Sequence, residues 1–527
     1  MKKCVCKMKR FVWLVCLGVL AACLSARGEV RITVSDQASF DRLPKDLSEA
    51  LASEENDIVV DFRKGVYHYR EKHLMLKGLY QPRKRIVLQC NGSVFLAEGP
   101  DYQLKSNDFR TYSAPAKGPF DYRMGFVDLL TMQSVDMRGP VRAALARPEI
   151  VDKAKGICRI KVNEPDLPVS AHAGVYIILS QWYRGMVYPV EKIEKGYLYF
   201  KSPKITSDRN ADTDPDADYK VLKELPHYIL YNHPDGGLDL HMTEKEIRGK
   251  AARRLHQSEV TNFLTVSNSQ LGSFTLQGAT FVTNHAGDCL IHFDGVSSTE
   301  TAVRDCRFDG IRSDIVRVHR STNILFCDNV VTRSYRRGIA VDFFTCGVEI
   351  RDNRFSDTGY MMDHDFCVEG QASGMWIHHN VFENFSFGAI GVGSHYMQSI
   401  PASAQGIIEQ NEMYCTAAFL ARPARLLMDS GAIYTWTINK DITIRDNDIH
   451  DIDGYGWNRG IFCDDGTVNV KIIGNRIRRI RNSYCIDLRL CTSVEKHPLS
   501  QIRRVNVGNK MADNVVDGKV RFQNRDE

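Results

Sequence analysis

Three aspartates and two large aromatic residues lie close together towards the C-terminal end of the sequence. Asp429 precedes the segment GAIYTW, which contains Tyr434 and Trp436, and Asp464 and Asp465 end the segment GIFCDD. Glycoside hydrolysis needs two carboxyl groups, one to protonate the leaving oxygen and one to attack the anomeric carbon or activate water. Aromatic faces supply stacking area for sugar rings. These five residues are therefore the candidate catalytic and substrate-binding set, provided that the fold brings the two segments together.

Short apolar segments that repeat from about residue 251 could provide that fold. One kind contains Asn, any residue and then an apolar residue, as in FCDNVV, and the other begins with a small residue and is near-alternating, as in GAIGVG. Two short strands per coil, with no helix-length apolar pattern, predict a solenoid. The repeating asparagines, 24 to 36 residues apart, are Asn329, Asn353, Asn380, Asn411, Asn447 and Asn475.

The recurring asparagine predicts a ladder of amides inside the solenoid. Asn tolerates the left-handed backbone of a sharp turn, and its amide can bond the Asn of the next coil. Each coil has an apolar stripe that it cannot bury alone, so stacked coils build a continuous core. We expect the asparagine stack to run along the whole solenoid.

The register of the coils places the candidate residues side by side. GAIYTW and GIFCDD are the same strand type in consecutive coils, and neighbouring strands lie about 4.8 Å apart. With Ile433 pointing inward, Tyr434 and Trp436 point outward next to Phe462 and Asp464. One outward patch is therefore expected to hold the carboxylates and both aromatic rings.

Further candidate sugar ligands lie on the same strand type or in its loops. Glu369 occupies an outward strand position, His395 and Tyr396 follow GAIGVG, and Trp457 lies in the loop between the two candidate strands. We expect these four residues to contribute to substrate binding.

The sequence predicts neither a metal site nor a cofactor. His378 and His379 are adjacent, and strand alternation predicts that their imidazoles face opposite sides. The Asp-rich stretch 207–220 is either a calcium loop or a solvated loop, and it lacks the Gly and the final Glu of an EF-hand. No phosphate-binding or dinucleotide fingerprint is present.

Arginines gather near the C-terminal end, in NRIRRIRN (475–482) and at Arg459 and Arg489. They could form a basic patch for uronic acids or sulfated glycans. The alternative is a solvated face near the end of the solenoid.

The repeat pattern over residues 251–510 resembles the right-handed parallel β-helix of the pectate-lyase-like superfamily. The segments DIVVDFRKGVYHY and RIVLQCNGSVFLAEG resemble its opening coils, and residues 41–52 resemble its capping helix. The resemblance implies an all-β solenoid. We expect a signal peptide at 1–22, an N-terminal cap with the first coils at 23–130, an inserted β-rich subdomain at 131–250 and the β-helix with a C-terminal cap at 251–527.

A closer resemblance rests on DSGAIYT, NDIHDI and GIFCDDG. Together they resemble the pattern D-x-G-A-I-Y, N-x-I-H, G-I-Y-x-D-[DE]-G of secreted β-helix glycoside hydrolases such as glycoside hydrolase family 141. The resemblance implies that Asp429 and either Asp464 or Asp465 are the catalytic carboxylates. Phe462 stands where that pattern has Tyr, and Asp465 stands where Glu is frequent.

The first residues have the pattern of an export signal. Five basic residues precede an apolar run that ends in Leu20-Ala21-Ala22-Cys23, which resembles a bacterial lipobox with Cys23 as the lipidated residue. Cleavage near Ala26 is the alternative. We therefore expect a periplasmic or cell-surface lipoprotein held to the membrane by a lipid anchor alone, or alternatively a secreted soluble protein.

Removing the leader also removes the excess of positive charge. The whole chain carries 69 Lys and Arg against 64 Asp and Glu, and five of these basic residues lie within residues 1–10, which leaves 64 against 64. A partner bound through net positive charge, such as nucleic acid, is not expected. With 43% hydrophobic and 25% charged residues, the composition excludes a disordered or polytopic membrane protein.

Three function classes remain open on this fold. The first is a glycoside hydrolase that acts on a complex polysaccharide. The second is a polysaccharide lyase or epimerase, which needs a base beside a neutralised uronate. The third is a non-catalytic glycan-binding solenoid, because a fold does not fix a function. An oligo- or polysaccharide is the expected partner in every case.

Overall fold

The structure is a computed structural model of the chain. It describes residues 28–103 and 254–523 except 343, 360–364, 372, 394–402, 421–429, 437–438, 454–457, 465–466, 482 and 490–507. Between these two parts it describes 105–106, 111–113, 125–135, 142–143, 149–152, 154–161, 175–181, 184–201, 227–231 and 240–241. The predicted leader and Cys23 lie outside the described residues. Within them, no helix is long and apolar enough to cross a membrane.

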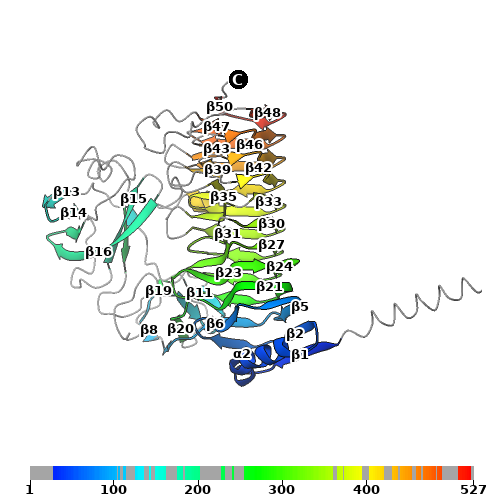
Figure 1. The fold of residues 1–527 in the computed structure, drawn as a ribbon. Coiled ribbons are helices and arrows are strands. Elements are labelled where there is room, and N and C mark those ends of the chain that lie inside the picture. Colours follow the sequence, from blue (N-terminus) through cyan, green and yellow to red (C-terminus); the bar gives the residue numbers. More distant parts are fainter. Residues whose placement is uncertain are drawn as a thin grey trace, which may run out of the picture.

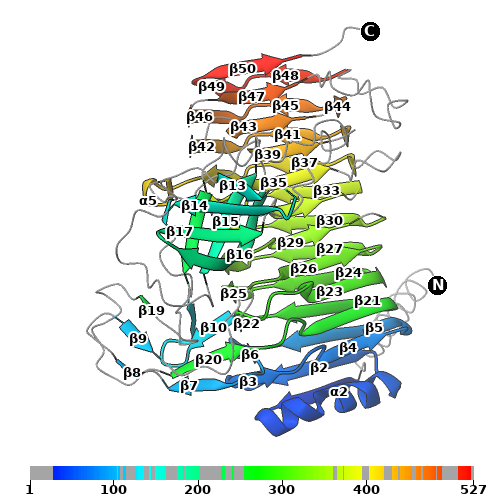
Figure 2. The ribbon, with the colours of Figure 1, turned by 90° about the vertical axis from the view of Figure 1, so that its left-hand side faces the viewer.

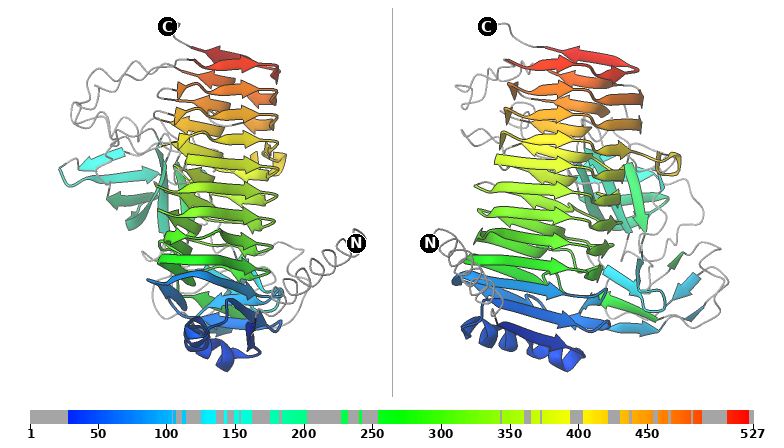
Figure 3. Two further views of the ribbon diagram at one scale, coloured as in Figure 1. Left: turned by 45° about the vertical axis from the view of Figure 1, so that its right-hand side comes forward. Right: turned by 90° about the vertical axis from the view of Figure 1, so that its right-hand side faces the viewer.

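The chain forms a column of stacked coils closed at one end by a helix (Figures 1 and 3). The helix α2 (Gln37–Ala52) follows β1 (Glu29–Val34) and buries Phe40 and Leu43 against the first coil. It begins earlier than the predicted residue 41, because Asp36 caps it by accepting from the backbone N–H of Ser39 at 2.8 Å. A helix over the end of the solenoid protects the core of the first coil from water.

Three parallel strands per coil build three faces, which we call the first, second and third sheets. The first sheet contains β4 (Leu74–Lys77), β23 (Cys289–Ser297), β26 (Asp314–His319), β29 (Ile339–Val341), β32 (Phe366–Gly370), β35 (Gly388–Gly393), β39 (Ser430–Trp436), β43 (Asn458–Cys463), β47 (Tyr484–Leu488) and β50 (Lys519–Phe522). The second contains β1, β2 (Asp57–Phe62), β24 (Glu300–Arg304), β27 (Thr322–Cys327), β30 (Cys346–Arg351), β33 (Ser373–His378), β37 (Ile407–Glu409), β41 (Thr443–Arg445), β45 (Lys471–Ile473) and β48 (Lys510–Ala512). Two long strands, β5 (Tyr80–Gln89) and β21 (Leu264–Gln277), run through both.

The third sheet consists of shorter strands. It contains β3 (Val66–Tyr69), β6 (Val94–Ala97), β22 (Thr280–Val282), β25 (Arg307–Asp309), β28 (Val330–Thr332), β31 (Arg354–Thr358), β34 (Val381–Phe385), β38 (Glu412–Tyr414), β42 (Asp448–Asp453), β46 (Arg476–Arg481) and β49 (Val515–Val516). A short helix, α5 (Ala417–Leu420), follows β38, and a small parallel sheet joins β36 (Ser403–Ala404), β40 (Asn439–Lys440) and β44 (Thr467–Val468).

The parallel β-helix confirms the predicted fold class, but the prediction of two strands per coil is wrong. Each asparagine-containing segment spans a corner. In FCDNVV, Cys327 ends β27 on the second sheet and Val330 begins β28 on the third. A strand of three residues is too short to show its own alternation, so the sequence pattern merges it with its neighbour.

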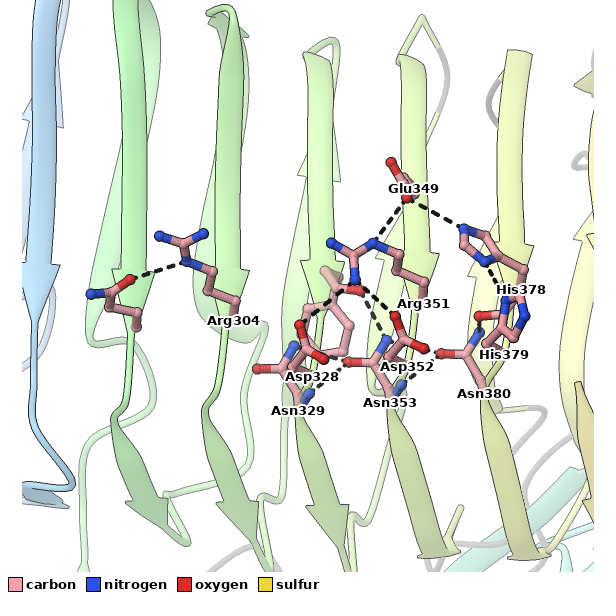
Figure 4. A network of polar contacts seen from close by, with 12 residues as sticks. Arg304, Asp328, Asn329, Glu349, Arg351, Asp352, Asn353, His378, His379 and Asn380 are labelled. Carbon is pink, nitrogen blue, oxygen red and sulfur yellow. Dashed lines mark hydrogen bonds and ion pairs between the residues drawn. The ribbon is translucent and has the colours of Figure 1, made fainter.

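The predicted asparagine ladder is present and buried. The backbone N–H and the Nδ2 of Asn353 both donate to Oδ1 of Asn380, at 3.0 and 2.9 Å, and its Nδ2 also donates to the carbonyl of Phe326 (Figure 4). The same bonds repeat coil after coil from Asn329 to Asn514, at 2.9 to 3.1 Å. The buried amides therefore satisfy one another, which removes the cost of burying them.

The sharp turn is made by the residue before each ladder asparagine and not by the asparagine itself, as the sequence had suggested. Asp328, Asp352 and His379 have φ of 57°, 55° and 54°. This left-handed residue turns the chain from the second to the third sheet, while the following Asn keeps its side chain directed inward.

Aromatic rings continue the stacking inside the core. Phe281 stacks on Phe308 with ring centroids 5.6 Å apart, and Phe355 stacks on Phe382 at 4.9 Å. Burying one side chain of this size contributes about 1.5–3 kcal/mol to the free energy of folding, relative to leaving it exposed.

Ten cysteines in the described part carry no disulfide, and nine of them are buried as small apolar residues.

In chain order, a set of antiparallel strands is inserted between the first coils and the rest of the column. A seven-stranded sheet joins β12 (Arg142–Ala143), β13 (Glu149–Asp152), β14 (Ile157–Lys161), β15 (Val175–Gln181), β16 (Arg184–Glu194), β17 (Tyr197–Lys201) and β18 (His227–Tyr231), and it stands to one side of the column (Figures 1 and 2). Two smaller sheets join β7 (Asp101–Gln103), β10 (Gly125–Asp128), β11 (Gln133–Val135) and β20 (Arg254–Ser258), and β8 (Lys105–Ser106), β9 (Thr111–Ser113) and β19 (Leu240–His241). The domain boundaries stated above remain a prediction.

Replacing one rung tests the ladder. Asn380→Ala removes the acceptor for two N–H groups of Asn353. Each orphaned buried donor costs about 1–3 kcal/mol, so we expect the free energy of unfolding in denaturant to fall by about 2–5 kcal/mol.

A matched variant lies at the end of the same ladder. Asn514 accepts the equivalent pair of bonds from Asn475 but is only half-buried, so water can replace it. We expect Asn514→Ala to cost less than half as much as Asn380→Ala. Equal losses, or no loss in either variant, would show that the ladder does not stabilise the fold.

Candidate active site on the first sheet

The outward residues of the first sheet form columns that run from coil to coil. Glu369 pairs with Gly391, Gly391 with Tyr434, Tyr434 with Phe462, and Phe462 with Asp487. The pairing of Tyr434 with Phe462 confirms the register expected from the sequence. Residues 22 to 43 positions apart in the chain thereby share one surface.

Asp464 lies at the end of β43, where two neighbouring coils supply its partners. The Tyr434 hydroxyl donates to Oδ2 at 3.2 Å, and Nη2 of Arg489 donates to Oδ1 at 2.7 Å. The residue is only 4% exposed. A charge-assisted hydrogen bond and a phenol donor stabilise the carboxylate form, so Asp464 is suited to act as a nucleophile or a base.

A row of aromatic rings extends along the first sheet from Phe462 and Tyr434, next to this carboxylate. Tyr434 stacks on Phe462 with centroids 4.7 Å apart, and Trp436 stacks on Phe366 at 5.5 Å. Tyr434 and Trp436 are 5% and 7% exposed, because their faces pack against these neighbours. Their function as sugar platforms remains a prediction, while their packing makes an apolar wall that lowers the local polarity around Asp464.

Two glycines of the segment GAIGVG make room for that wall. A Cβ on Gly393 would lie 2.1 Å from the Trp436 indole, and one on Gly391 would lie 2.4 Å from the Phe366 ring. Any larger residue would displace the rings from the sheet.

The arginines near Asp464 are held by carboxylates. Nε of Arg459 donates to Asp487 at 2.9 Å, and its guanidinium lies 3.7 Å from the centroid of the Phe462 ring. Nη2 of Arg521 donates to the same carboxylate at 2.7 Å. Asp487 is fully buried, so its charge requires both partners.

The arginines do not form a single basic patch. Arg459 and Arg489 lie on the first sheet, whereas Arg478 and Arg481 extend from β46 on the third sheet, facing Asp448 and Asp453 of the preceding coil at 2.9 and 3.6 Å. The solvated-face alternative therefore fits NRIRRIRN, and the two sets of arginines do not meet.

A second polar cluster lies on the first sheet in coils nearer the N-terminal end of the column, and the sequence did not predict it. Asp314 accepts from Nη2 of Arg337 at 2.8 Å, and Nη1 of Arg337 lies 3.1 Å from Oε2 of Glu369. Arg336 lies between Asp314 and Asp365, at 3.8 and 3.6 Å. The adjacent arginines were the only sequence signal, and they gave no indication of their partners in other coils.

The pKa values of two carboxyls beside Arg337, those of Glu369 and Asp314, are shifted in opposite directions. Burial raises the pKa of Glu369 more than Arg337 lowers it, so this pKa lies above its ordinary value. Burial also acts to raise the pKa of Asp314, but Arg337, Arg336 and Arg317 together outweigh it and hold the pKa below its ordinary value. Glu369 is thus the carboxyl on this face that holds its proton more readily.

Glu369 and Asp464 are too far apart to act on one bond. They lie on β32 and at the end of β43, three coils apart, which corresponds to about 14 Å at the usual strand spacing.

Five predicted site residues fall outside the described part of the chain, namely Asp429, Asp465, His395, Tyr396 and Trp457. Asp464 is therefore the predicted catalytic residue whose surroundings are known.

The prediction that His378 and His379 face opposite sides is wrong. Their Nδ1 atoms lie 2.8 Å apart, because the left-handed backbone of His379 interrupts the alternation (Figure 4). Within the residues whose placement is known, no group of three or more His, Cys, Asp or Glu could hold a metal ion.

Comparison with known proteins gives a structural match. No family model and no curated protein matches the sequence. A solved structure described as "Glycoside hydrolase" aligns over 92% of this chain and 96% of that chain, with a TM-score of 0.63 and 11% identity. It has the same fold, and at this identity the likeness shows the fold alone.

Two further solved structures align more weakly. They are the complex of XylC with xylose (TM-score 0.33, 10% identity, 86% of this chain and 70% of that chain) and a periplasmic alginate epimerase, AlgG (0.20, 11%, 49% and 76%). Neither superposition is close enough to bear on this chain's function.

The pH dependence of stability tests the environment of Glu369. Its raised pKa means that its contribution to stability is full below the pKa of an unfolded glutamate, about 4.3, and is lost as the pH rises through the higher folded value. We expect the free energy of unfolding of the wild type, relative to Glu369→Gln, to fall as the pH rises from about 4 to 7.

Asp451 serves as a comparison, because its pKa is lowered where that of Glu369 is raised. The hydrogen bond from Arg479 lowers the pKa of Asp451, so its stabilising contribution is present above the ordinary value and is lost as the pH falls. The difference between the wild type and Asp451→Asn should therefore rise with pH. A Glu369→Gln difference that also rises with pH would contradict the burial effect.

Proposed function

We propose that this chain is a carbohydrate-active enzyme that hydrolyses glycosidic bonds on the outer face of the first sheet. The observation that carries the proposal is Asp464, a carboxylate held by Tyr434 and Arg489 beside an aromatic wall. The fold shared with a solved glycoside hydrolase supports it, as does the segment pattern DSGAIYT with GIFCDDG.

The proposed mechanism divides the roles between two aspartates. Asp464, stabilised as a carboxylate, attacks the anomeric carbon or activates water. Asp429 or Asp465 donates the proton to the leaving oxygen; in the sequence, Asp429 directly precedes β39 and Asp465 directly follows Asp464. A carboxyl separation of about 5 Å would give retention of configuration, and one of about 6.5–9.5 Å would give inversion.

The ion pairs on this face favour hydrolysis over elimination or epimerisation. A lyase or epimerase must neutralise a uronate carboxylate, usually with arginine or lysine. Arg459, Arg489 and Arg521 are each bound to an aspartate of the protein. A neutral glycan therefore fits this surface better than a uronate.

The leader is part of the same proposal. We infer that the chain is exported and tethered by acylation of Cys23, because a basic start, an apolar run and LAAC occur in that order. We expect Cys23→Ala, expressed in a bacterial host, to move the protein from the membrane fraction to the soluble fraction; unchanged membrane association would contradict lipid anchoring.

Asp464→Asn tests the catalytic assignment. The variant keeps the size of the side chain and removes its charge. We expect kcat for release of reducing ends from neutral polysaccharides to fall at least about 100-fold, with little change in KM.

Asp453→Asn is the matched control, because it also removes an aspartate paired with arginine, on the third sheet. It should keep wild-type turnover, and near-ultraviolet circular dichroism should show that both variants are folded. Full activity in Asp464→Asn would contradict the proposed role of Asp464 in hydrolysis. Products that absorb in the ultraviolet would instead identify a lyase, and glycan binding without turnover in the wild type would identify a binding protein.

A further inference from the structure

A tryptophan stands exposed on the second sheet, away from the proposed active site. Trp376 on β33 is 41% exposed, whereas Trp436 near Asp464 is only 7% exposed. Trp376 points outward between Glu349 of the preceding coil and Ile407 of the next. An exposed aromatic ring on a rigid sheet offers apolar area on which a sugar ring can stack.

The indole is held in one orientation. Its Nε1 donates to Oε1 of Glu409 at 2.7 Å, and one ring face stacks on His378 with centroids 4.0 Å apart. Burial acts to raise the pKa of Glu409, but the hydrogen bonds from Arg445 and Trp376 outweigh it, so the pKa lies below its ordinary value and the acceptor is charged. The ring is therefore preorganised, and its exposed area lies mainly on the face turned away from His378.

The sheet beside Trp376 is open. Gly374, two residues earlier on β33, pairs with Gly347 of the preceding coil, and both are exposed. A Cβ on Gly374 would find only the backbone nitrogen of Gly347, 4.0 Å away. Both glycines lack a side chain and are exposed, so a sugar ring can approach the backbone at this point of the described surface.

Polar groups border the same place. Glu349 lies 3.3 Å from Nε2 of His378 and 3.0 Å from Nε of Arg351, as Figure 4 shows. Acceptors and donors fixed around an aromatic face are what a sugar with several hydroxyls requires.

We propose that the surface formed by Trp376, Gly374, Gly347 and Glu349, here called the Trp376 platform, binds a pyranose ring of a neutral polysaccharide. The apolar face of the sugar packs on the exposed face of the indole, and its hydroxyls bond to the carboxylate of Glu349, the residue that pairs with Trp376 on the preceding coil. Because the platform lies on the second sheet and Asp464 on the first, it binds polymer outside the active site. Such a second contact raises the local concentration of substrate at the enzyme.

The charge around the platform excludes an acidic glycan as the preferred ligand. The guanidinium of Arg351 is surrounded by the carboxylates of Glu349, Asp328 and Asp352, at 3.0, 3.7 and 2.8 Å. Glu409 beside the indole is itself paired with Arg445, so the local excess of negative charge comes from the three carboxylates around Arg351. A uronate would meet this negative potential, whereas a neutral sugar would not.

Affinity gel electrophoresis tests the platform with defined polymers. The full-length Asp464→Asn protein is run in gels that contain soluble neutral glucan, xylan or mannan, with polygalacturonate and alginate as anionic comparisons. We expect at least one neutral polymer to retard the protein. We expect Trp376→Ala in the same background to raise Kd about tenfold or more, and Trp376→Phe to raise it less.

Tyr80→Ala is the control, because Tyr80 is 76% exposed on β5 and its side chain makes no hydrogen bond or ring contact with other residues that the structure describes. It should leave Kd unchanged, and thermal unfolding should show that every variant is folded. Equal retardation of Trp376→Ala and its parent, retardation by anionic polymers only, or no retardation by any neutral polymer would overturn the proposal. If Asp464→Asn keeps full turnover while Trp376→Ala loses binding, the proposed mechanism fails and the platform stands.

Discussion

The hydrogen bond between stacked asparagines is the constraint on which the rest of this structure depends. Each amide accepts two N–H bonds from the asparagine of the preceding coil, donates to a backbone carbonyl of that same coil, and donates to the asparagine of the next coil. A coil that slipped by one residue would lose all of these bonds. Such a slip would also turn every outward side chain into the core. The ladder thus fixes the corner between the second and third sheets, and with it the column to which each outward residue belongs.

Fixed columns let residues far apart in sequence act together, and they also restrict which charges are tolerated. Tyr434, Asp464 and Arg489 come from three consecutive coils and meet at one carboxylate. Like charges one coil apart would repel at about 4.8 Å, whereas Asp487 lies between Arg459 and Arg521 of the neighbouring coils. The two proposed glycan sites are the places where aromatic rings interrupt this pattern of ion pairs.

The sequence was sufficient for the fold, the ladder and the pairing of Tyr434 with Phe462, because these follow from spacing and alternation alone. It was insufficient for the third sheet, whose strands can be as short as Val330–Thr332. It also missed the cluster around Arg337, since a partner in another coil is identified only once the register is known. The sequence also failed to predict how deeply outward residues are buried. Strand alternation correctly predicted that Trp436 points outward, but it could not show that neighbouring rings cover this side chain.

The central claim is that Asp464 takes part in cleavage of a glycosidic bond on the first sheet. A crystal structure of the Asp464→Asn variant with an uncleaved neutral oligosaccharide tests it most directly. We expect a sugar whose anomeric carbon lies beside the side chain of residue 464, with a second carboxyl group about 5–9.5 Å from it on the other side of the bond. Sugar bound only elsewhere, or a nearest second carboxyl more than about 10 Å away, would contradict the claim.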